Sequence, residues 1–320
     1  MSNIEQLREA LLRISEIAAE AGSAAGEGYT AEIAAPALCT PKSLPQSLLV
    51  AAAKTATDIN PVNAPMMGPM ASLGADFVLE PLQIAVLTAK YWGPTPRRLS
   101  VSFMESTPSA LRDRIIGHMN AWNQKCGVQF VGTNGLGQVR ISRAPGGYWS
   151  YLGTDIFHIP QNRQTMNLQN FTMNTPESEF KRVVRHETGH TLGFPHEHMR
   201  RQLVALIDRQ KAYDYFLRTQ NWSQAMVDAQ VLTPLDDQSI MGTAPDQTSI
   251  MCYQLPGAIT KNGQPIIGGV DINATDYAFA ARIYPKPGAA TIEHDPLVDA
   301  EGFDQATDYE WSGSAAAASA

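Results

Sequence analysis

One stretch of the chain decides the fold: His186-Glu187-Thr188-Gly189-His190-Thr191-Leu192-Gly193-Phe194-Pro195-His196. On a helix, His186 and His190 lie four residues apart and project from the same face, close enough to bind one metal ion. Gly193 can adopt the left-handed conformation that ends a helix, so that the chain turns and brings His196 back as a third ligand. Three neutral imidazoles with a fourth position left for water form an open, catalytic zinc site, because structural sites are usually closed by four protein ligands.

Glu187 directly follows the first histidine. Its carboxylate lies beside the metal but is directed past it, where it can take a proton from a metal-bound water instead of binding the metal. Zinc lowers the pKa of its water to about 7, which makes hydroxide available at neutral pH. The stretch therefore predicts a zinc-dependent hydrolase in which Glu187 is the general base.

The spacing H-E-x-x-H-x-x-G-x-x-H is a metzincin signature. Within it, Gly193-Phe194-Pro195-His196-Glu197-His198 resembles the astacin form of the motif, and Arg200 matches an arginine found shortly after it. The resemblance implies an α+β fold, a metzincin-type zinc peptidase with a twisted mixed sheet, an active-site helix and an irregular C-terminal subdomain. It covers about residues 86–285, which we interpret as the catalytic domain.

A second segment, Ser249-Ile250-Met251-Cys252-Tyr253, resembles the astacin Met-turn S-I-M-H-Y. The resemblance implies that Met251 lies beneath the zinc and that Tyr253 is a switchable extra ligand that hydrogen-bonds the developing oxyanion. Cys252 stands where the family usually has a histidine, so the surroundings of the turn stay open. The competing segment Ser239-Ile240-Met241 lacks a tyrosine two residues on, and we therefore assign the turn to Met251.

Residues 165–169, Thr165-Met166-Asn167-Leu168-Gln169, match in position the edge strand that lines the cleft in this family. An edge strand has free backbone groups with which an extended peptide can pair. We therefore expect Met166, Asn167 and Leu168 to bind the substrate. The alternative is a strand edge that is covered by its own loops.

Hydrophobic periodicity predicts the remaining elements of this domain. We expect strands at residues 99–103, 128–131 and 139–141, and helices at 108–125, 176–192, 203–219 and 271–284, the last capped by Asn273 or Thr275.

The first 85 residues divide into two predicted segments. Residues 1–22 have Ser2 and Glu5 at capping-box spacing and apolar residues at helical spacing, which predicts an amphipathic helix. Residues 23–85 are rich in Pro and Ala and are a linker or an inhibitory pro-segment; the prolines should prevent long regular elements. Some metzincin pro-segments silence the zinc with an acidic or thiol side chain. Asp76 is the first candidate and Cys39 the second, with ordinary loop residues as the alternative.

Residues 286–320 are acidic and end in Ala and Ser, which is typical of a disordered tail. The N-terminal helix is no signal peptide, so we expect a chain that is cytoplasmic at synthesis, with export by a non-classical route left open. The three cysteines are widely spaced and form no C-x-x-C pair, so that paired disulfides are not expected.

Composition limits the function further. The 320 residues are 44% hydrophobic and 17% charged, which suits one or two globular domains with a sizeable core. No run of about 18 apolar residues predicts a transmembrane segment. A formal charge of −7 without clusters of Lys and Arg argues against nucleic-acid binding. The sequence does not indicate an oligomeric state.

Together these features predict a zinc endopeptidase with a protein or peptide substrate. One alternative is a catalytically inactive, zinc-containing module that binds proteins through the same cleft, although such a module has no need of Glu187. Another is a hydrolase of small amides on the same metal, but an open cleft beside a free strand edge favours peptides.

Overall fold

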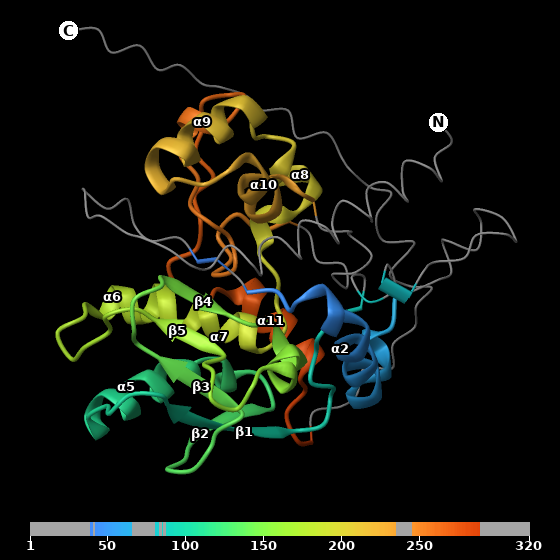
Figure 1. Cartoon of the computed structure of the whole chain (residues 1–320), viewed down its shortest axis with the longest axis vertical. Coiled ribbons are helices and arrows are strands. Elements are labelled where there is room, and N and C mark those ends of the chain that lie inside the picture. Colours follow the sequence, from blue (N-terminus) through green and yellow to red (C-terminus); the bar gives the residue numbers. More distant parts are fainter. Residues whose placement is uncertain are drawn as a thin grey trace, which may run out of the picture. The chain divides into compact units, whose positions relative to one another are not determined.

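Five strands form a mixed sheet in the spatial order β2-β1-β3-β5-β4 (Figure 1). Their bounds are β1 Arg97–Phe103, β2 Val128–Gly132, β3 Val139–Ser142, β4 Tyr148–Ser150 and β5 Met166–Leu168. Neighbouring strands are parallel except for β4, which is antiparallel to β5. The strands predicted at 99–103, 128–131 and 139–141 are confirmed.

This computed structural model describes residues 39–40, 42–65, 81–82, 85, 88–234 and 245–288. The predicted helix at 1–22, Asp76, Met241 and the tail after residue 288 lie outside the described residues. All described elements up to Pro287 belong to one compact unit. No helix in the described ranges is long and apolar enough to cross a membrane.

The prediction that residues 165–169 form an edge strand is wrong. Strand β5 pairs with β3 through Met166 on one side and with β4 through Asn167 on the other. The order of strands along the chain does not fix their order in the sheet: here β4 precedes β5 in sequence and lies outside it. The Asn167 amide strengthens this arrangement by donating to the backbone oxygens of Ala144 and Gly147 before β4, at 3.1 and 2.7 Å. The edge of the sheet is therefore β4.

The core lies between the sheet and two helical stretches. Helix α5, Ser109–Met119, and the 3-10 turn η2, Trp122–Gln124, replace the single helix predicted at 108–125 and pack against β2. The apolar side chains expected on its buried face are buried: Leu111, Ile115, Met119 and Trp122. Asn120 ends the helix and exchanges two 2.8 Å hydrogen bonds with the backbone of Phe130, which fixes α5 on the sheet.

The predicted helix at 176–192 is present as three consecutive pieces. These are α6 Glu177–Glu179, the π-helical turn η4 Phe180–Val184 and α7 Arg185–Thr191. A π-turn within a helix is rare and is frequently found at functional sites. Helix α7 lies against β4, so the zinc motif faces the edge of the sheet (Figure 1).

The C-terminal part consists of short helices around a second apolar cluster. They are η5 Glu197–Met199, α8 Arg201–Val204, α9 Arg209–Gln220, α10 Gln224–Val227, η6 Asp228–Leu232, η8 Gly257–Ile259 and α11 Ala274–Ile283. The helix predicted at 203–219 is split because Asp208 caps the start of α9. For the closing helix, Asn273 is the cap, and it forms a capping box with Asp276.

Before the catalytic region, the structure contains the 14-residue helix α2, Gln46–Ile59 (blue in Figure 1), followed by the 3-10 turn η1, Pro61–Asn63. The prediction that prolines prevent a long element here is wrong. Pro45 directly precedes the helix and Pro61 follows its C-cap, so neither interrupts it, and the interior is rich in Ala and Leu, which favour helix. Its apolar face, including Leu49, packs against the 3-10 helix η3, Gly153–His158.

The side chain of Asn63 fastens this segment to the catalytic region. Its amide nitrogen donates to the backbone oxygens of Ala56 and Tyr91 at 2.9 and 2.8 Å, and its oxygen accepts from the Tyr91 N–H at 2.9 Å. Asn63 is almost fully buried, and a buried amide that lost these partners would cost about 1–3 kcal/mol for each group left unsatisfied. Residues 42–63 are therefore a docked part of the structure rather than a free linker.

Candidate active site

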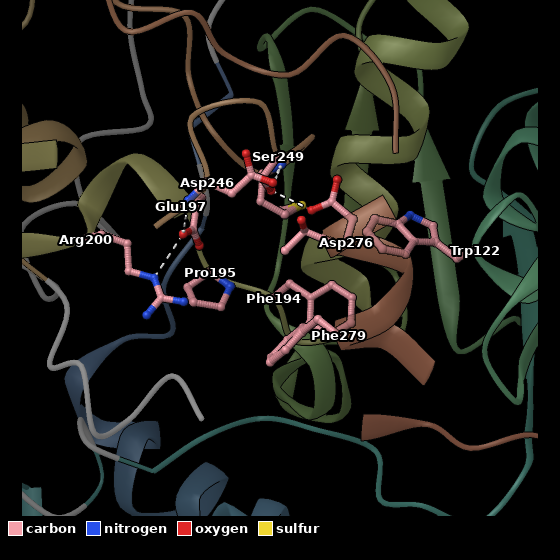
Figure 2. A pocket seen from close by; sticks show the side chains of 11 residues that line it. Trp122, Phe194, Pro195, Glu197, Arg200, Asp246, Ser249, Asp276 and Phe279 are labelled. Carbon is pink, nitrogen blue, oxygen red and sulfur yellow. Dashed lines mark hydrogen bonds and ion pairs between the residues drawn. The ribbon is translucent and has the colours of Figure 1, made fainter. Parts of the chain in front are cut away.

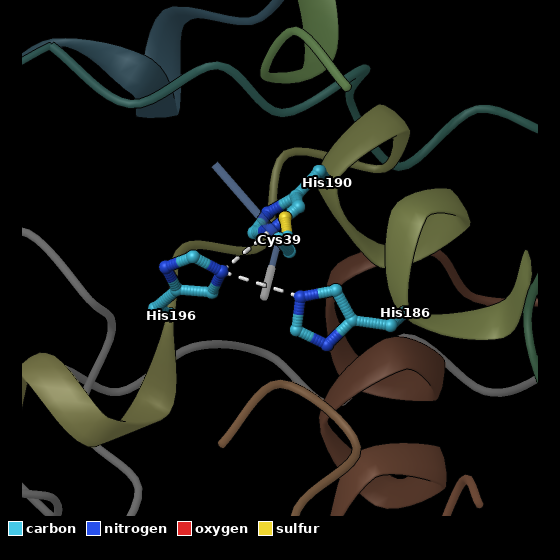
Figure 3. A group of neighbouring side chains, drawn as sticks. All are labelled: Cys39, His186, His190 and His196. Atoms are coloured by element: carbon cyan, nitrogen blue, oxygen red, sulfur yellow. Dashed lines mark hydrogen bonds between the residues drawn. The ribbon is translucent and has the colours of Figure 1, made fainter. Parts of the chain in front are cut away.

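Three imidazoles converge at the end of helix α7 (Figure 3). The Nε2 atom of His196 lies 3.2 Å from that of His186 and 3.0 Å from that of His190. Ligand atoms bound to one tetrahedral zinc at 2.0–2.1 Å lie about 3.3 Å from one another. The spacing of the three nitrogens therefore fits one zinc ion, as the sequence predicts.

The second nitrogen of two of these rings determines which atom faces the metal position. Nδ1 of His186 donates to the Ile250 oxygen at 2.6 Å, and Nδ1 of His190 donates to the Phe194 oxygen at 2.8 Å. Because these Nδ1 atoms carry the proton, the Nε2 atoms present lone pairs, and the short Nε2 distances are approaches of metal ligands rather than hydrogen bonds.

Burial keeps the three ligands neutral. It lowers the pKa of His186 to about 4 and the pKa values of His190 and His196 well below the usual value. Neutral imidazole is the form that binds a metal.

The turn that returns His196 to the site is a glycine C-cap. Gly193 has φ +94°, its N–H donates to His190 O at 2.8 Å, and the Phe194 N–H donates to Gly189 O at 2.9 Å. This pair of bonds is the Schellman motif. A Cβ at position 193 would also lie 3.0 Å from the backbone oxygen of Lys90, so the turn requires glycine for two reasons.

Met251 lies directly beneath the zinc helix. A Cβ built on Gly189 would lie 2.3 Å from the Met251 sulfur, so the helix approaches the turn this closely only because residue 189 is glycine. Asp276 holds the turn by accepting from the Ser249 hydroxyl at 2.6 Å and from the Ile250 N–H at 2.9 Å. The sequence reasoning missed Gly189, although a glycine inside a helix, which costs about 1 kcal/mol relative to alanine, was a signal for it.

Glu187 is 1% exposed, and neither of its carboxylate oxygens has a hydrogen-bond partner among the described residues. Burial raises the pKa of Glu187 to about 8, against smaller opposing effects of Cys39 and Arg182. A divalent cation beside the carboxylate lowers that pKa again, because an opposite charge favours the ionised form. The carboxylate is thus placed next to the ligand group without taking part in it.

Tyr253 lies against two histidine rings. Its ring stacks on His198, with centroids 4.1 Å apart and planes 13° from parallel, and its centroid lies 4.2 Å from that of His196. The Tyr253 hydroxyl is buried and has no hydrogen-bond partner among the described residues. His198, whose Nε2 lies 2.9 Å from Gln230 O, supports this ring and was not singled out from the sequence.

Cys39 completes the group around the metal position, although it lies far before the histidines in the sequence. Its sulfur and one nitrogen of each of the three histidines all lie within 4.8 Å of one another (Figure 3). Burial raises the pKa of the Cys39 thiol well above its usual value, and the Glu187 carboxylate adds to this. Of the two blocking residues proposed from the sequence, the second choice lies in the site, and Asp76 is outside the described residues.

The residues after Cys39 occupy the edge strand. The N–H of Thr40 donates to Tyr148 O at 3.1 Å and the N–H of Lys42 to Ser150 O at 3.2 Å, and the bridges run parallel to β4. The Lys42 ammonium also lies 5.5 Å from the ring centroid of Trp149. The backbone groups that an added peptide strand would use are thus partly taken by the chain itself.

Two hollows adjoin the site. The larger, of about 340 Å³, is lined by Cys39, His186, Glu187, Tyr253 and Cys252, together with residues considered below. The smaller is shown in Figure 2, where Glu197 accepts from Arg200 Nε and from the Asp246 N–H, both at 3.1 Å. Since the Glu197 N–H also donates to Met251 O at 2.9 Å, this smaller hollow belongs to the support of the turn. All three cysteines, Cys39, Cys126 and Cys252, are free.

Comparisons with known proteins agree with this geometry. Residues 86–278 match the family model Astacin, which describes a family of peptidases. A solved structure of myroilysin is 30% identical, with a TM-score of 0.58, and the match covers 62% of this chain and 96% of that chain. The hatching enzyme High choriolytic enzyme 1, a zinc-protease from Oryzias latipes (Medaka fish), is 20% identical, with a TM-score of 0.40 and coverage of 57% and 87%. No curated protein matches the chain. The chain therefore belongs to the astacin family of peptidases and is a zinc metalloendopeptidase with the α+β metzincin fold.

Proposed function

We propose that this protein cleaves internal peptide bonds of proteins with Glu187 as the general base. The observation that carries the proposal is the convergence of three imidazole Nε2 atoms beside a buried carboxylate that no described residue binds. His186, His190 and His196 would hold the zinc, which when bound acts as a Lewis acid and lowers the pKa of water.

Glu187 has one task in each half of the reaction. One of its free oxygens accepts the proton of the attacking water, and the same carboxyl then donates that proton to the leaving amine nitrogen. Removal of water contacts by burial favours this transfer, because a base with a pKa near the working pH is most efficient. A protein that only binds zinc and a partner has no use for such a base, so the inactive alternative has no support in this site.

Tyr253 stabilises negative charge in this proposal. Burial raises the pKa of its hydroxyl well above the usual value, so the group stays protonated and can donate a hydrogen bond to the oxyanion that develops on the scissile carbonyl. The unpartnered state of the hydroxyl among the described residues supports this role, since a buried donor without a partner is costly unless it has a function.

Tyr253→Phe should lower kcat more than it raises KM, because it removes a donor that acts mainly in the transition state. Loss of one such donor typically costs about 10²–10³ in kcat. Steady-state kinetics on one peptide would measure this, with Tyr213→Phe as a control that removes a hydroxyl bound to Asp228, away from the cleft. A phenylalanine variant with unchanged kcat would contradict the assignment of Tyr253.

The edge strand β4, rather than β5, is the proposed docking site for the substrate backbone. The Tyr148 and Ser150 oxygens of β4 accept hydrogen bonds from Thr40 and Lys42, and an extended substrate can replace these donors one for one. Residues 39–63 are accordingly proposed as an inhibitory pro-segment: Cys39 would take the fourth metal position as a thiolate, and the residues after it cover the strand edge.

The experiment that tests the proposed function is cleavage of a mixed peptide library by the zinc-loaded full-length protein and its Cys39→Ser variant. We expect cuts at internal bonds, detected by mass spectrometry. A chelator should reduce the rate by about 100-fold or more and added zinc should restore it, since base and metal act together. Cleavage that persists unchanged after verified removal of the metal, or no cleavage by either zinc-loaded protein, would overturn the proposal.

A further inference from the structure

Among the described residues, Arg182 is the one Lys or Arg side chain that lines the larger cavity. It lies in the π-helical turn, four residues before His186, and both side chains border the cavity together with Glu187. Its influence reaches the site, because its positive charge lowers the pKa of Glu187 and of the Cys39 thiol as a secondary effect after burial. A guanidinium in this place would normally select an acidic substrate side chain, since it binds carboxylates in two-pronged fashion.

In this chain the guanidinium already has a carboxylate. Arg182 Nε donates to Glu179 Oε1 at 3.0 Å and Nη2 donates to Glu179 Oε2 at 2.8 Å. The two side chains are only 32% and 33% exposed, so the pair is partly shielded from solvent. The Arg182 hydrogen bond holds the pKa of Glu179 below its usual value, and Glu179 keeps the pKa of Arg182 above its usual value despite burial. Both groups are therefore charged at neutral pH and their charges cancel.

The rest of the cavity wall is largely apolar. Ile250 and Leu255 form buried parts of the lining, and Ile267 and Val270 stand at the wall 60% and 73% exposed. Large exposed apolar side chains beside a cavity mark a surface that gains free energy when another apolar group covers it. A substrate side chain of this kind would bury both its own surface and theirs.

We propose that Glu179 determines the substrate specificity of this cleft: by pairing with Arg182 it makes the cavity suit an apolar side chain beside the scissile bond and disfavour an acidic one. The inference deepens the proposed peptidase function and rests on it. Glu179 does not line the cavity itself and so acts through Arg182. An acidic substrate residue would have to compete with Glu179 for the guanidinium while it also faced the Glu187 carboxylate, and like charges at short distance repel.

The test compares cleavage of paired peptides that differ only in one residue, Leu or Glu, on either side of the scissile bond. It uses the zinc-loaded full-length chain with Cys39→Ser, with and without Glu179→Gln. We expect the first protein to favour Leu. Glu179→Gln should raise the kcat/KM ratio of the Glu peptide to the Leu peptide roughly tenfold, which corresponds to about 1.4 kcal/mol. The gain should shrink at high salt, because the freed charge is partly exposed.

Glu177→Gln is the matched control. It removes the same charge from the same helical turn, but the Glu177 carboxylate pairs with Arg114 at 2.8 Å and not with Arg182. It should leave the Leu-to-Glu ratio unchanged. Adding Arg182→Met to Glu179→Gln should abolish the gain. Since a glutamine could still accept one hydrogen bond from Arg182, Glu179→Ala serves as a second variant that frees the guanidinium completely.

A preference for the Glu peptide before any change at residue 179, or no shift in Glu179→Gln and Glu179→Ala, would overturn the inference while leaving peptidase activity established. Binding provides a separate measurement if no peptide is cleaved. With Cys39→Ser and Glu187→Gln combined, fluorescence anisotropy should show the same tenfold change in relative affinity when Glu179→Gln is added. Absence of cleavage together with this change in affinity would contradict the proposed function but not the role of Glu179.

Discussion

Glu187→Gln is expected to keep a full equivalent of zinc and the native fold and to lose at least about 100-fold in kcat, the lower end of what general-base catalysis contributes. The amide has nearly the shape of the carboxylate but cannot accept the proton of the attacking water. Zinc retention follows because the ligand group consists of His186, His190 and His196, which the change leaves in place. Metal analysis, a thermal unfolding curve and peptide kinetics would measure the three quantities together.

The same change also tests what burial does to this residue. An unpartnered carboxylate that is 1% exposed is costly, so Glu187→Gln should leave the free energy of unfolding unchanged or raise it while activity falls. If the variant retained more than about a tenth of the wild-type rate, the base would have to be another residue, since a general base contributes at least about 10²-fold.

Cys39→Ser is expected to raise the basal peptidase activity of the full-length chain. The change removes the sulfur from the metal position and leaves the contacts of Thr40 and Lys42 with β4. We expect a rise of at least about tenfold, the effect of 1.4 kcal/mol of blocking free energy. Asp76→Ala should have no such effect if the thiol is the blocking group, and Cys126→Ala controls for the loss of a buried thiol elsewhere.

Cobalt in place of zinc gives a second measure of this contact. A thiolate bound to cobalt produces a charge-transfer absorption, which should be present in the wild-type protein and absent from Cys39→Ser. Equal basal activity of the two proteins, together with identical cobalt spectra, would show that Cys39 does not bind the metal. Activation by Asp76→Ala instead would return the blocking role to the acidic residue preferred from the sequence.

The sequence predicted the metal ligands because all three lie within one short stretch, residues 186–196, where helix geometry and one turn set their positions. It also predicted Asn273 as a helix cap and the strands at 128–131 and 139–141, since caps and alternating apolar residues are local signals. Each of these features depends on neighbours in the chain rather than on distant contacts.

What it did not predict depends on contacts between distant segments. The outer position of β4 depends on pairing between segments that are not fixed by chain order, and so β5 was taken for the edge. Cys39 reaches the site because α2 and Asn63 dock its segment on the catalytic region, which no local pattern in residues 23–85 shows. The proline count misled in the same region, because the positions of Pro45 and Pro61 at the helix boundaries matter more than their number.

The Asn63 clamp changes what a cut in the chain accomplishes. As long as Asn63 and Tyr91 belong to one chain, residues 39–63 are presented to the cleft at the millimolar effective concentration that a short covalent connection provides. A proteolytic cut between them removes the connection but none of the hydrogen bonds that Asn63 makes, nor the apolar contacts of α2. The severed segment is then an ordinary bound ligand whose dissociation depends on the concentration of the protein. Dilution after the cut, rather than the cut itself, would complete the release of the active site.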